Sequence, residues 1–206
     1  MVTKDSNPAS GDRRVRRTRT ALARALIRLV EERDLSRISV SDVAAGAEVS
    51  RSAFYDHYRD VHELAEDACT AMIDGLLESL PVPAHGADME EEATRSLAAF
   101  FASLAEHAGL YRALLGPQGS ARVVDHIRRR IAEVTVDHLA RTGDGTPPQG
   151  VPHDIAAAFI AGALIGVAVD WLQHGCPRPP AEMATATWPL LNAHYRLDPH
   201  GHAPAS

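Results

Sequence analysis

The sequence lacks the short motifs that mark most enzymes and metalloproteins. It has no G-x-S-x-G elbow, no P-loop and no G-x-G-x-x-G segment. Its eleven histidines include no i, i+4 pair of the kind that binds metal on a helix, and Cys69 and Cys176 match no metal-ligand spacing. We therefore expect no enzymatic activity, no metal and no cofactor.

Two further absences concern the compartment. With only two cysteines, far apart in the sequence, a reduced cytoplasmic chain is the simplest interpretation. The N-terminus has charge but no apolar segment of a secretory signal. Residues 155–169 form an apolar run, but a membrane span needs about 20 residues, and Asp154 and Asp170 bracket this run. We expect a buried helix there and no membrane association.

No convincing alternation of apolar and polar residues, the pattern of a strand, occurs anywhere, whereas helical periodicity recurs. The sequence therefore predicts an all-α fold of about nine helices. Proline- and glycine-rich segments at 81–87 and 143–152 separate some of them. The expected helices are residues 18–32, two short helices capped by Ser39 or Ser41 and by Ser50, and residues 60–80, 89–107, 109–115, 119–142, 154–174 and 181–195.

The net charge of −6 hides an uneven distribution. Residues 1–64 contain 12 Lys+Arg and 10 Asp+Glu, whereas residues 65–206 contain 9 and 17. Within residues 13–28 there are seven arginines and no acidic residue. Because local charge is what meets a phosphate backbone, an acidic average does not exclude a nucleic-acid partner.

Residues 39–64, SVSDVAAGAEVSRSAFYDHYRDVHEL, carry the most informative pattern in the chain. They read as two short helices joined by a tight turn, and the second helix carries polar and aromatic side chains suited to a DNA groove. A helix-turn-helix next to a basic segment is typical of a DNA-binding protein.

Three short helices followed by about six more resemble the TetR/AcrR-type family of transcriptional regulators. The segment AEVSRSAFYDHY, residues 47–58, resembles the family signature AGVS-x-x-T-x-Y-x-H-F. Asp42-Val43-Ala44 and Glu63-Leu64 also match the family pattern, and the similarity covers residues 18–64. The remainder is similar only in helix count and in the segment FIAGALIGVAVDWL.

Two positions depart from the family pattern. Glu48 stands where the family usually has glycine in the turn, so this residue has a cost if its φ is positive. Val61 stands where many members have a lysine that contacts phosphate. Arg59, His62 and the basic arm are candidates to replace that contact.

Candidate DNA-binding residues lie on and around the second short helix and on the basic arm. Arg51 suits a guanine edge or a phosphate, and the resemblance implies that Tyr55 and His57 reach the DNA backbone. The alternative is a solvated surface, with Phe54 and Tyr58 in the core. The basic arm, Arg13 to Arg19, follows phosphate, enters a minor groove, or is merely a solubilising, disordered tail. The full candidate set is Arg17, Arg19, Ser41, Ser50, Arg51, Ser52, Tyr55, His57, Tyr58 and His62.

Two further sets belong to the C-terminal part. Gly162 and Gly166 allow close helix approach, and the resemblance implies a homodimer interface there, with intrachain packing as the alternative. This set is Ile155, Phe159, Gly162, Ile165, Gly166, Val169, Trp188 and Leu191. Candidates for a ligand cavity, which are equally explained as core, are Met72, Phe100, Phe101, His107, Tyr111 and Trp171.

Together these patterns predict a homodimeric regulator, expected to be a repressor, that binds a palindromic double-stranded operator and is released by an unknown small-molecule effector. The alternatives are a DNA-binding protein without an effector, whose C-terminal half serves dimerisation or partner contact, and a helical enzyme or carrier. The predicted division is a disordered arm (1–12), a helix-turn-helix DNA-binding domain (13–64), a ligand-binding and dimerisation domain (65–197) and a flexible tail (198–206).

Overall fold

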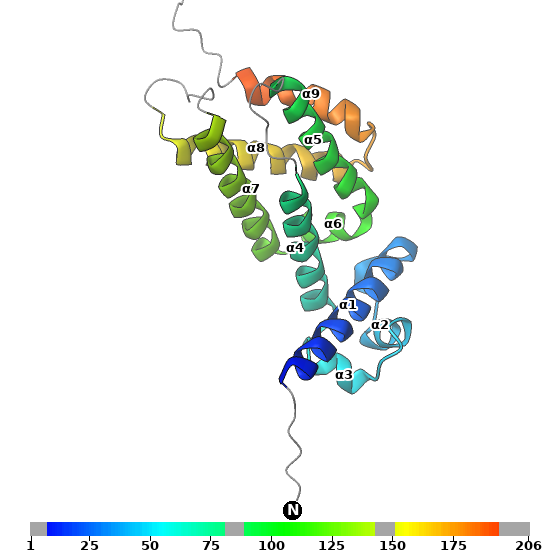
Figure 1. The fold of residues 1–206 in the computed structure, drawn as a ribbon. Helices are drawn as coiled ribbons and strands as arrows, with labels where there is room; N and C mark the ends of the chain where they lie inside the picture. Colours follow the sequence, from blue (N-terminus) through cyan, green and yellow to red (C-terminus); the bar gives the residue numbers. More distant parts are fainter. Residues whose placement is uncertain (1–7, 81–88, 143–150, 194–206) are drawn as a thin grey trace, which may run out of the picture. The chain divides into compact units, whose positions relative to one another are not determined.

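The computed structural model describes residues 8–80, 89–142 and 151–193 (Figure 1). These residues form nine α-helices, one short 3-10 helix and no strand, which confirms the predicted all-α fold. The predicted linker 81–87, residues 143–150 of the predicted loop 143–152, and the tail 198–206 lie outside the described residues. The elements are α1 (Pro8–Glu32), η1 (Leu35–Arg37), α2 (Val40–Gly46), α3 (Arg51–Tyr55), α4 (Val61–Ser79), α5 (Met89–Glu106), α6 (Ala108–Leu115), α7 (Ala121–Thr142), α8 (His153–Gln173) and α9 (Pro180–Ala193).

Helix α1 begins at Pro8, ten residues earlier than the sequence predicted. The expectation of a disordered arm is therefore wrong for residues 8–12, and residues 1–7 lie outside the described residues. Proline is favoured at the first helical position, and arginine is a good helix former. The prediction missed this part of α1 because the buried apolar stripe begins only at Leu22.

The chain divides into two compact units, and α4 contributes to both. The first unit comprises Met1–Met72 and Gly109–Ser120, and the second comprises Ile73–Ala108 and Ala121–Ser206. This division differs from the predicted boundary after residue 64, because α6 groups with the N-terminal helices. That grouping depends on contacts between segments far apart in the sequence, which local patterns do not reveal.

The first unit has a core built from α1, α2, α3 and the first part of α4. Leu22, Leu26, Val43, Phe54 and Leu64 are almost completely buried. Helix α6 approaches α1 closely: a Cβ atom at Gly109 would lie only 2.8 Å from the Val30 carbonyl oxygen. The Ser120 hydroxyl, just after α6, donates a hydrogen bond of 2.6 Å to Glu66 on α4.

The second unit packs α5 against α9 and α7 against α8 (Figure 1). Phe101 contacts both Phe100 and Trp171 edge to face, with ring centroids 5.5 and 5.4 Å apart. At the end of α4, Asp74 accepts hydrogen bonds from Arg130 (2.8 Å) and shares one with His126 (3.1 Å). Burial alone would raise the pKa of Asp74, but these two partners on α7 outweigh it and lower the pKa.

Helix α8 is long and apolar enough to cross a membrane, judged by length and composition alone. The core helix of a soluble protein meets the same criterion, and Ala157, Ala161, Leu164 and Leu172 of α8 are buried. The length of this helix is therefore weak support for a membrane protein.

Candidate nucleic-acid interface

Helices α2 and α3 both begin with a side-chain cap. The Ser39 hydroxyl accepts a hydrogen bond from the Asp42 backbone N–H, and the Asp42 carboxylate accepts from the Ser39 backbone N–H at 2.9 Å. The Ser39 hydroxyl and backbone N–H lower the pKa of the Asp42 carboxyl. Ser50 caps α3 by accepting from the Ala53 N–H at 3.1 Å. Of the two serines considered for α2, Ser39 is therefore the cap, and Ser41 lies exposed within the helix.

The turn between α2 and α3 requires a left-handed residue, and Glu48 occupies that position with φ of 57°. The Glu48 N–H donates to the Ala45 carbonyl and the Val49 N–H to the Ala44 carbonyl, so the turn is fully hydrogen-bonded at these groups. A non-glycine residue here has a conformational cost of about 1 kcal/mol or more. The positive φ on which the expected cost of Glu48 depends is therefore present, and the turn itself is formed.

Helix α3 has one buried and one exposed side. Phe54 is fully buried, which confirms its prediction as a core residue, and Tyr55 is 52% exposed. Arg51 and Ser52 are also exposed, whereas His57 is half-buried. The structure thus places Ser50, Arg51, Ser52 and Tyr55 on or at the start of one short helix, where their side chains are accessible to a partner.

Tyr58 and Arg19 share a hydrogen-bonded network. The burial of Tyr58 corrects its assignment as a direct DNA contact, whereas the Arg19 side chain stays 47% exposed and remains a candidate. Tyr58 is only 4% exposed, and its hydroxyl donates to Asp67 at 2.6 Å. Arg19 donates to the same hydroxyl at 3.0 Å and to Asp67 at 2.6 Å. Burial and the Asp67 hydrogen bond raise the pKa of Tyr58 to about 12, and the Asp67 and Tyr58 hydrogen bonds raise the pKa of Arg19.

Val61, the second position that departs from the family pattern, is the first residue of α4. Val61 is 7% exposed and contributes to the core, whereas His62 is exposed. The Arg59 side chain is 81% exposed and pairs with Glu63 at 3.2 Å. His62 and Arg59, rather than position 61, are therefore accessible at the start of this helix.

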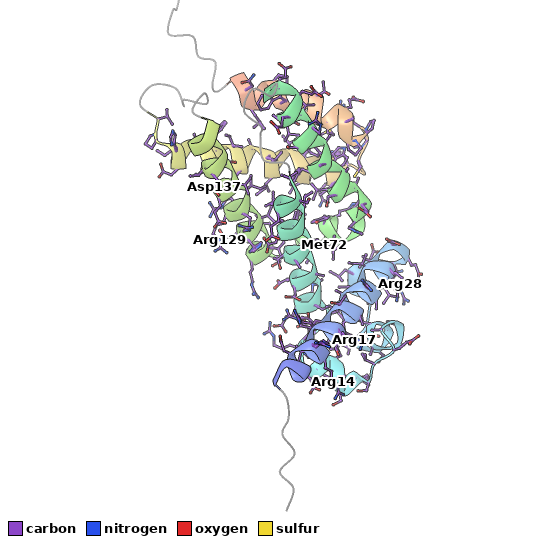
Figure 2. All side chains as sticks on the ribbon, viewed as in Figure 1. Arg14, Arg17, Arg28, Met72, Arg129 and Asp137 are labelled. Carbon is purple, nitrogen blue, oxygen red and sulfur yellow. The ribbon has the colours of Figure 1, made fainter. Side chains whose placement is uncertain are left out.

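Arg17 lies on an exposed part of α1 together with three arginines that are not in the candidate set, although two of them belong to the basic arm. Arg13, Arg16, Arg17 and Arg24 line an open hollow of about 450 Å³ along with Thr20 and Ala21. Their spacing is visible in the sequence. It did not indicate one face of a helix, because the helix was expected to begin only at residue 18, after Arg13, Arg16 and Arg17. Figure 2 labels Arg17 and Arg28 on this helix.

The predicted ligand candidates do not form one site within either unit. Met72 and Tyr111 belong to the first unit, and the other four belong to the second. Phe100, Phe101 and Trp171 are at most 4% exposed and pack on one another. Two hollows formed by described residues, the arginine-lined one and another of about 520 Å³ beside the end of α1, contain none of the six candidates.

The candidate dimer residues divide by exposure. Ile155 and Phe159 of α8 are 57% and 49% exposed, and a Cβ at Gly162 or Gly166 would meet no atom within 4 Å. Ile165, Val169 and Trp188 are half-buried. Leu191 is only 7% exposed, so its assignment to the interface is corrected to the core of its own chain. Its neighbour Leu190, which the prediction missed, is 70% exposed.

Comparison with known proteins agrees with this arrangement. Residues 22–68 match the family described as bacterial regulatory proteins, tetR family, and residues 91–192 match a transcriptional regulator C-terminal region. A Bacillus subtilis (strain 168) relative, an uncharacterized HTH-type transcriptional regulator YxbF, is 40% identical over 70 residues. That match covers 32% of this chain and spans 18% of the length of the relative.

Solved structures share the fold over most of the chain. A tetR-family transcriptional regulator from Streptomyces coelicolor is 22% identical with a TM-score of 0.67, covering 85% of this chain and 81% of that one. The transcriptional repressor FadR of Thermus thermophilus, in complex with lauroyl-CoA, is 19% identical with a TM-score of 0.67. It covers 91% of this chain and 100% of its own.

Proposed function

The chain belongs to the TetR family of DNA-binding transcriptional regulators, and we propose that it is a repressor that binds a palindromic operator as a homodimer and is released by a small effector. We also propose that it acts in the cytoplasm and has no enzymatic activity. The observation that carries the DNA-binding part is the capped helix α3, with Phe54 anchored in the core and Arg51, Ser52 and Tyr55 exposed.

The proposed contacts follow from the chemistry of these side chains. Arg51 is placed at the first turn of α3, where its planar guanidinium reaches a guanine edge or a phosphate. Ser50, Ser52, Tyr55 and His57 offer hydroxyl or ring N–H groups to the backbone of the DNA. The remaining proposed contacts are Arg17, Arg19, Ser41 and His62.

A homodimer explains the apolar exposure of the second unit. Ile155, Phe159 and Leu190 are large apolar side chains that water would otherwise surround. Gly162 and Gly166 leave open space on the same helix, which permits close approach of a second helix. A dimer with two α3 helices about one turn of DNA apart, roughly 34 to 36 Å, would read a palindrome.

Release by an effector requires a difference in affinity between two conformations. Such an effector binds better to a state in which the two α3 helices are wrongly spaced for DNA. The difference between its affinities for the two states sets the largest shift in the conformational equilibrium, and so the largest loss of operator binding. The Thermus thermophilus structure contains lauroyl-CoA. We propose that the effector of this chain is also partly apolar, so lauroyl-CoA is the first compound to test.

A second candidate function is a DNA-binding regulator without an effector. The tight packing of Phe100, Phe101 and Trp171 supports it, because these aromatic candidates contact one another rather than line a hollow. In that case the C-terminal half serves dimerisation or partner contact. A screen of effectors against the operator complex separates the two, since only the first function predicts ligand-dependent release.

The DNA-binding proposal is tested by selecting duplexes from a random-sequence pool and measuring affinity by fluorescence anisotropy. Arg51→Ala should weaken binding to the selected duplex by about fivefold or more, because a bidentate base contact contributes about 1–3 kcal/mol. Arg95→Ala, which removes the same charge from α5, is the matched control and should bind as the wild type does. Failure of the wild-type protein to enrich any sequence, or equal affinity of the two variants, would contradict the proposal.

A further inference from the structure

Four arginines form one side of helix α1, here named the α1 arginine face: Arg13, Arg16, Arg17 and Arg24. Counted from Arg13, the other three follow after three, four and eleven residues, which places all four on one side of a helix. All four are exposed, and none forms an ion pair with a described carboxylate. Such a group of like charges repels itself unless an anion is bound nearby.

The arginine face points away from the core of its own unit. Leu22 and Leu26 are fully buried, and helical geometry places them on the opposite side of α1 from Arg13 and Arg24. Two arginines of α1 outside the face make hydrogen bonds within this unit. Arg19 donates to Tyr58 and Asp67, and Arg28 donates to the Gly46 carbonyl at 2.9 Å. The face therefore remains for a partner outside this unit.

The face also begins near the end of the proposed recognition helix. Arg19 contacts Tyr58, three residues after α3 ends, and Arg17 and Arg13 precede Arg19 by about 3 and 9 Å along the helix axis. Figure 2 shows Arg14 and Arg17 toward one end of α1 and Arg28 toward the other. The N-terminal part of the face therefore lies within about 9 Å of Arg19 along the axis, on the side of α1 that, at Arg17, is about 160° round from the contact with Tyr58.

Helical structure decides how these arginines meet DNA. An α-helix with its side chains is about 10–12 Å wide, whereas the minor groove of B-DNA is about 6 Å wide. Residues 13–24 are helical, so they do not enter the minor groove as an extended arm would. From Arg13 to Arg24 the face extends about 16 Å, which corresponds to about five phosphates of one strand.

We propose that the α1 arginine face binds the phosphate backbone of DNA flanking the half-site, outside the base pairs that α3 reads. This inference rests on the proposed operator binding and adds a second contact surface to it. The contact increases affinity and salt dependence without altering sequence preference, because phosphates are the same beside every base. A helix that is already formed loses less conformational entropy on binding than a disordered arm.

The experiment compares two duplexes containing the sequence that the wild-type protein selects: one trimmed to the selected sequence, and one extended by ten base pairs at each end. Affinity is measured at several salt concentrations by fluorescence anisotropy. The test variant combines Arg13→Gln, Arg17→Gln and Arg24→Gln, which preserves helix propensity because glutamine is a good helix former. The matched control combines Arg95→Gln, Arg128→Gln and Arg129→Gln, which removes the same charge from α5 and α7.

On the extended duplex, the test variant should bind at least tenfold more weakly than the wild type. Its salt slope should fall by about one unit per lost phosphate contact. On the trimmed duplex it should match the wild type, and the control should match the wild type on both. A gain variant, Thr20→Arg, adds a charge within the same hollow and should steepen the salt slope on the extended duplex alone.

Unchanged affinity and salt slope of the test variant on the extended duplex would overturn the inference while leaving operator binding intact. An equal loss on both duplexes would also overturn it, because the arginines would then act within the half-site. Failure of the wild-type protein to select a sequence would overturn the proposed function itself. If circular dichroism shows that the triple variant has lost helix, Thr20→Arg decides, and an unchanged slope for it counts against the inference.

Discussion

Arg17 and Arg19 are two residues apart in the sequence, yet they have opposite surroundings. Arg17 lies in the exposed hollow of α1, whereas Arg19 donates to Tyr58 and forms an ion pair with Asp67. A rotation of about 200° between positions i and i+2 of a helix accounts for this difference. Composition alone treats these residues as equivalent members of a basic segment. Their roles differ because only Arg19 faces α4.

Tyr55 and Tyr58 provide a matched test of this distinction. Tyr58→Phe removes the hydroxyl that Arg19 and Asp67 share, so we expect the free energy of unfolding to fall by about 1 kcal/mol. Tyr55→Phe keeps the ring on Phe54 and removes an exposed hydroxyl, so stability should stay unchanged while DNA affinity falls about fivefold. Urea unfolding and anisotropy measure the two effects. Equal stability of the two variants would show that the internal network contributes nothing.

At the scale of elements, capping and periodicity account for most helix boundaries. Ser39 and Ser50 cap α2 and α3; the sequence predicted the Ser50 cap and left Ser39 and Ser41 as alternatives for the first. The start of α1 was wrong because its first three turns have no buried apolar stripe to reveal them. The approach of α6 to α1 was also not predicted, since it depends on Gly109 meeting a carbonyl 79 residues earlier in the chain.

Gly109 and Gly75 test whether that approach matters. Gly109→Ala introduces a Cβ 2.8 Å from the Val30 carbonyl oxygen, so we expect a loss of about 1–3 kcal/mol in the free energy of unfolding. Gly75→Ala, on α4, meets no atom within 4 Å and should gain about 0.5–1 kcal/mol from helix propensity. Chemical denaturation measures both. A Gly109→Ala protein as stable as Gly75→Ala would show that α6 moves away from α1 without cost.

At the scale of the whole molecule, the two units expose different kinds of side chain. The first unit exposes charged and polar groups along α1 and α3, whereas the second exposes large apolar side chains on α8 and α9. Charge suits a phosphate backbone, and apolar area suits a protein surface. This division supports the proposal that one unit binds DNA and the other joins two copies of the chain.

Phe159→Glu tests the proposed dimer without disturbing the core, because Phe159 is 49% exposed. A carboxylate buried between two copies would lose its hydration, so we expect the dimer dissociation constant to rise at least tenfold. Ala102→Glu adds the same charge to an exposed position of α5 and serves as the control. Sedimentation equilibrium measures the dissociation constants. A Phe159→Glu protein that dimerises as tightly as the control would exclude this side of α8 from the interface.

The sequence by itself determined the all-α fold, the helix-turn-helix with a serine cap at each short helix, and the resemblance to the family, because each depends on residues close together in the chain. The left-handed conformation of Glu48 came from the structure. Only the tertiary structure decided which side chains remain exposed. Arg19 finds Asp67 at a separation of 48 residues, Leu191 turns inward while Leu190 turns outward, and α6 joins the N-terminal helices. Periodicity shows that a helix has two sides, but the segment that covers one of them comes from elsewhere in the chain.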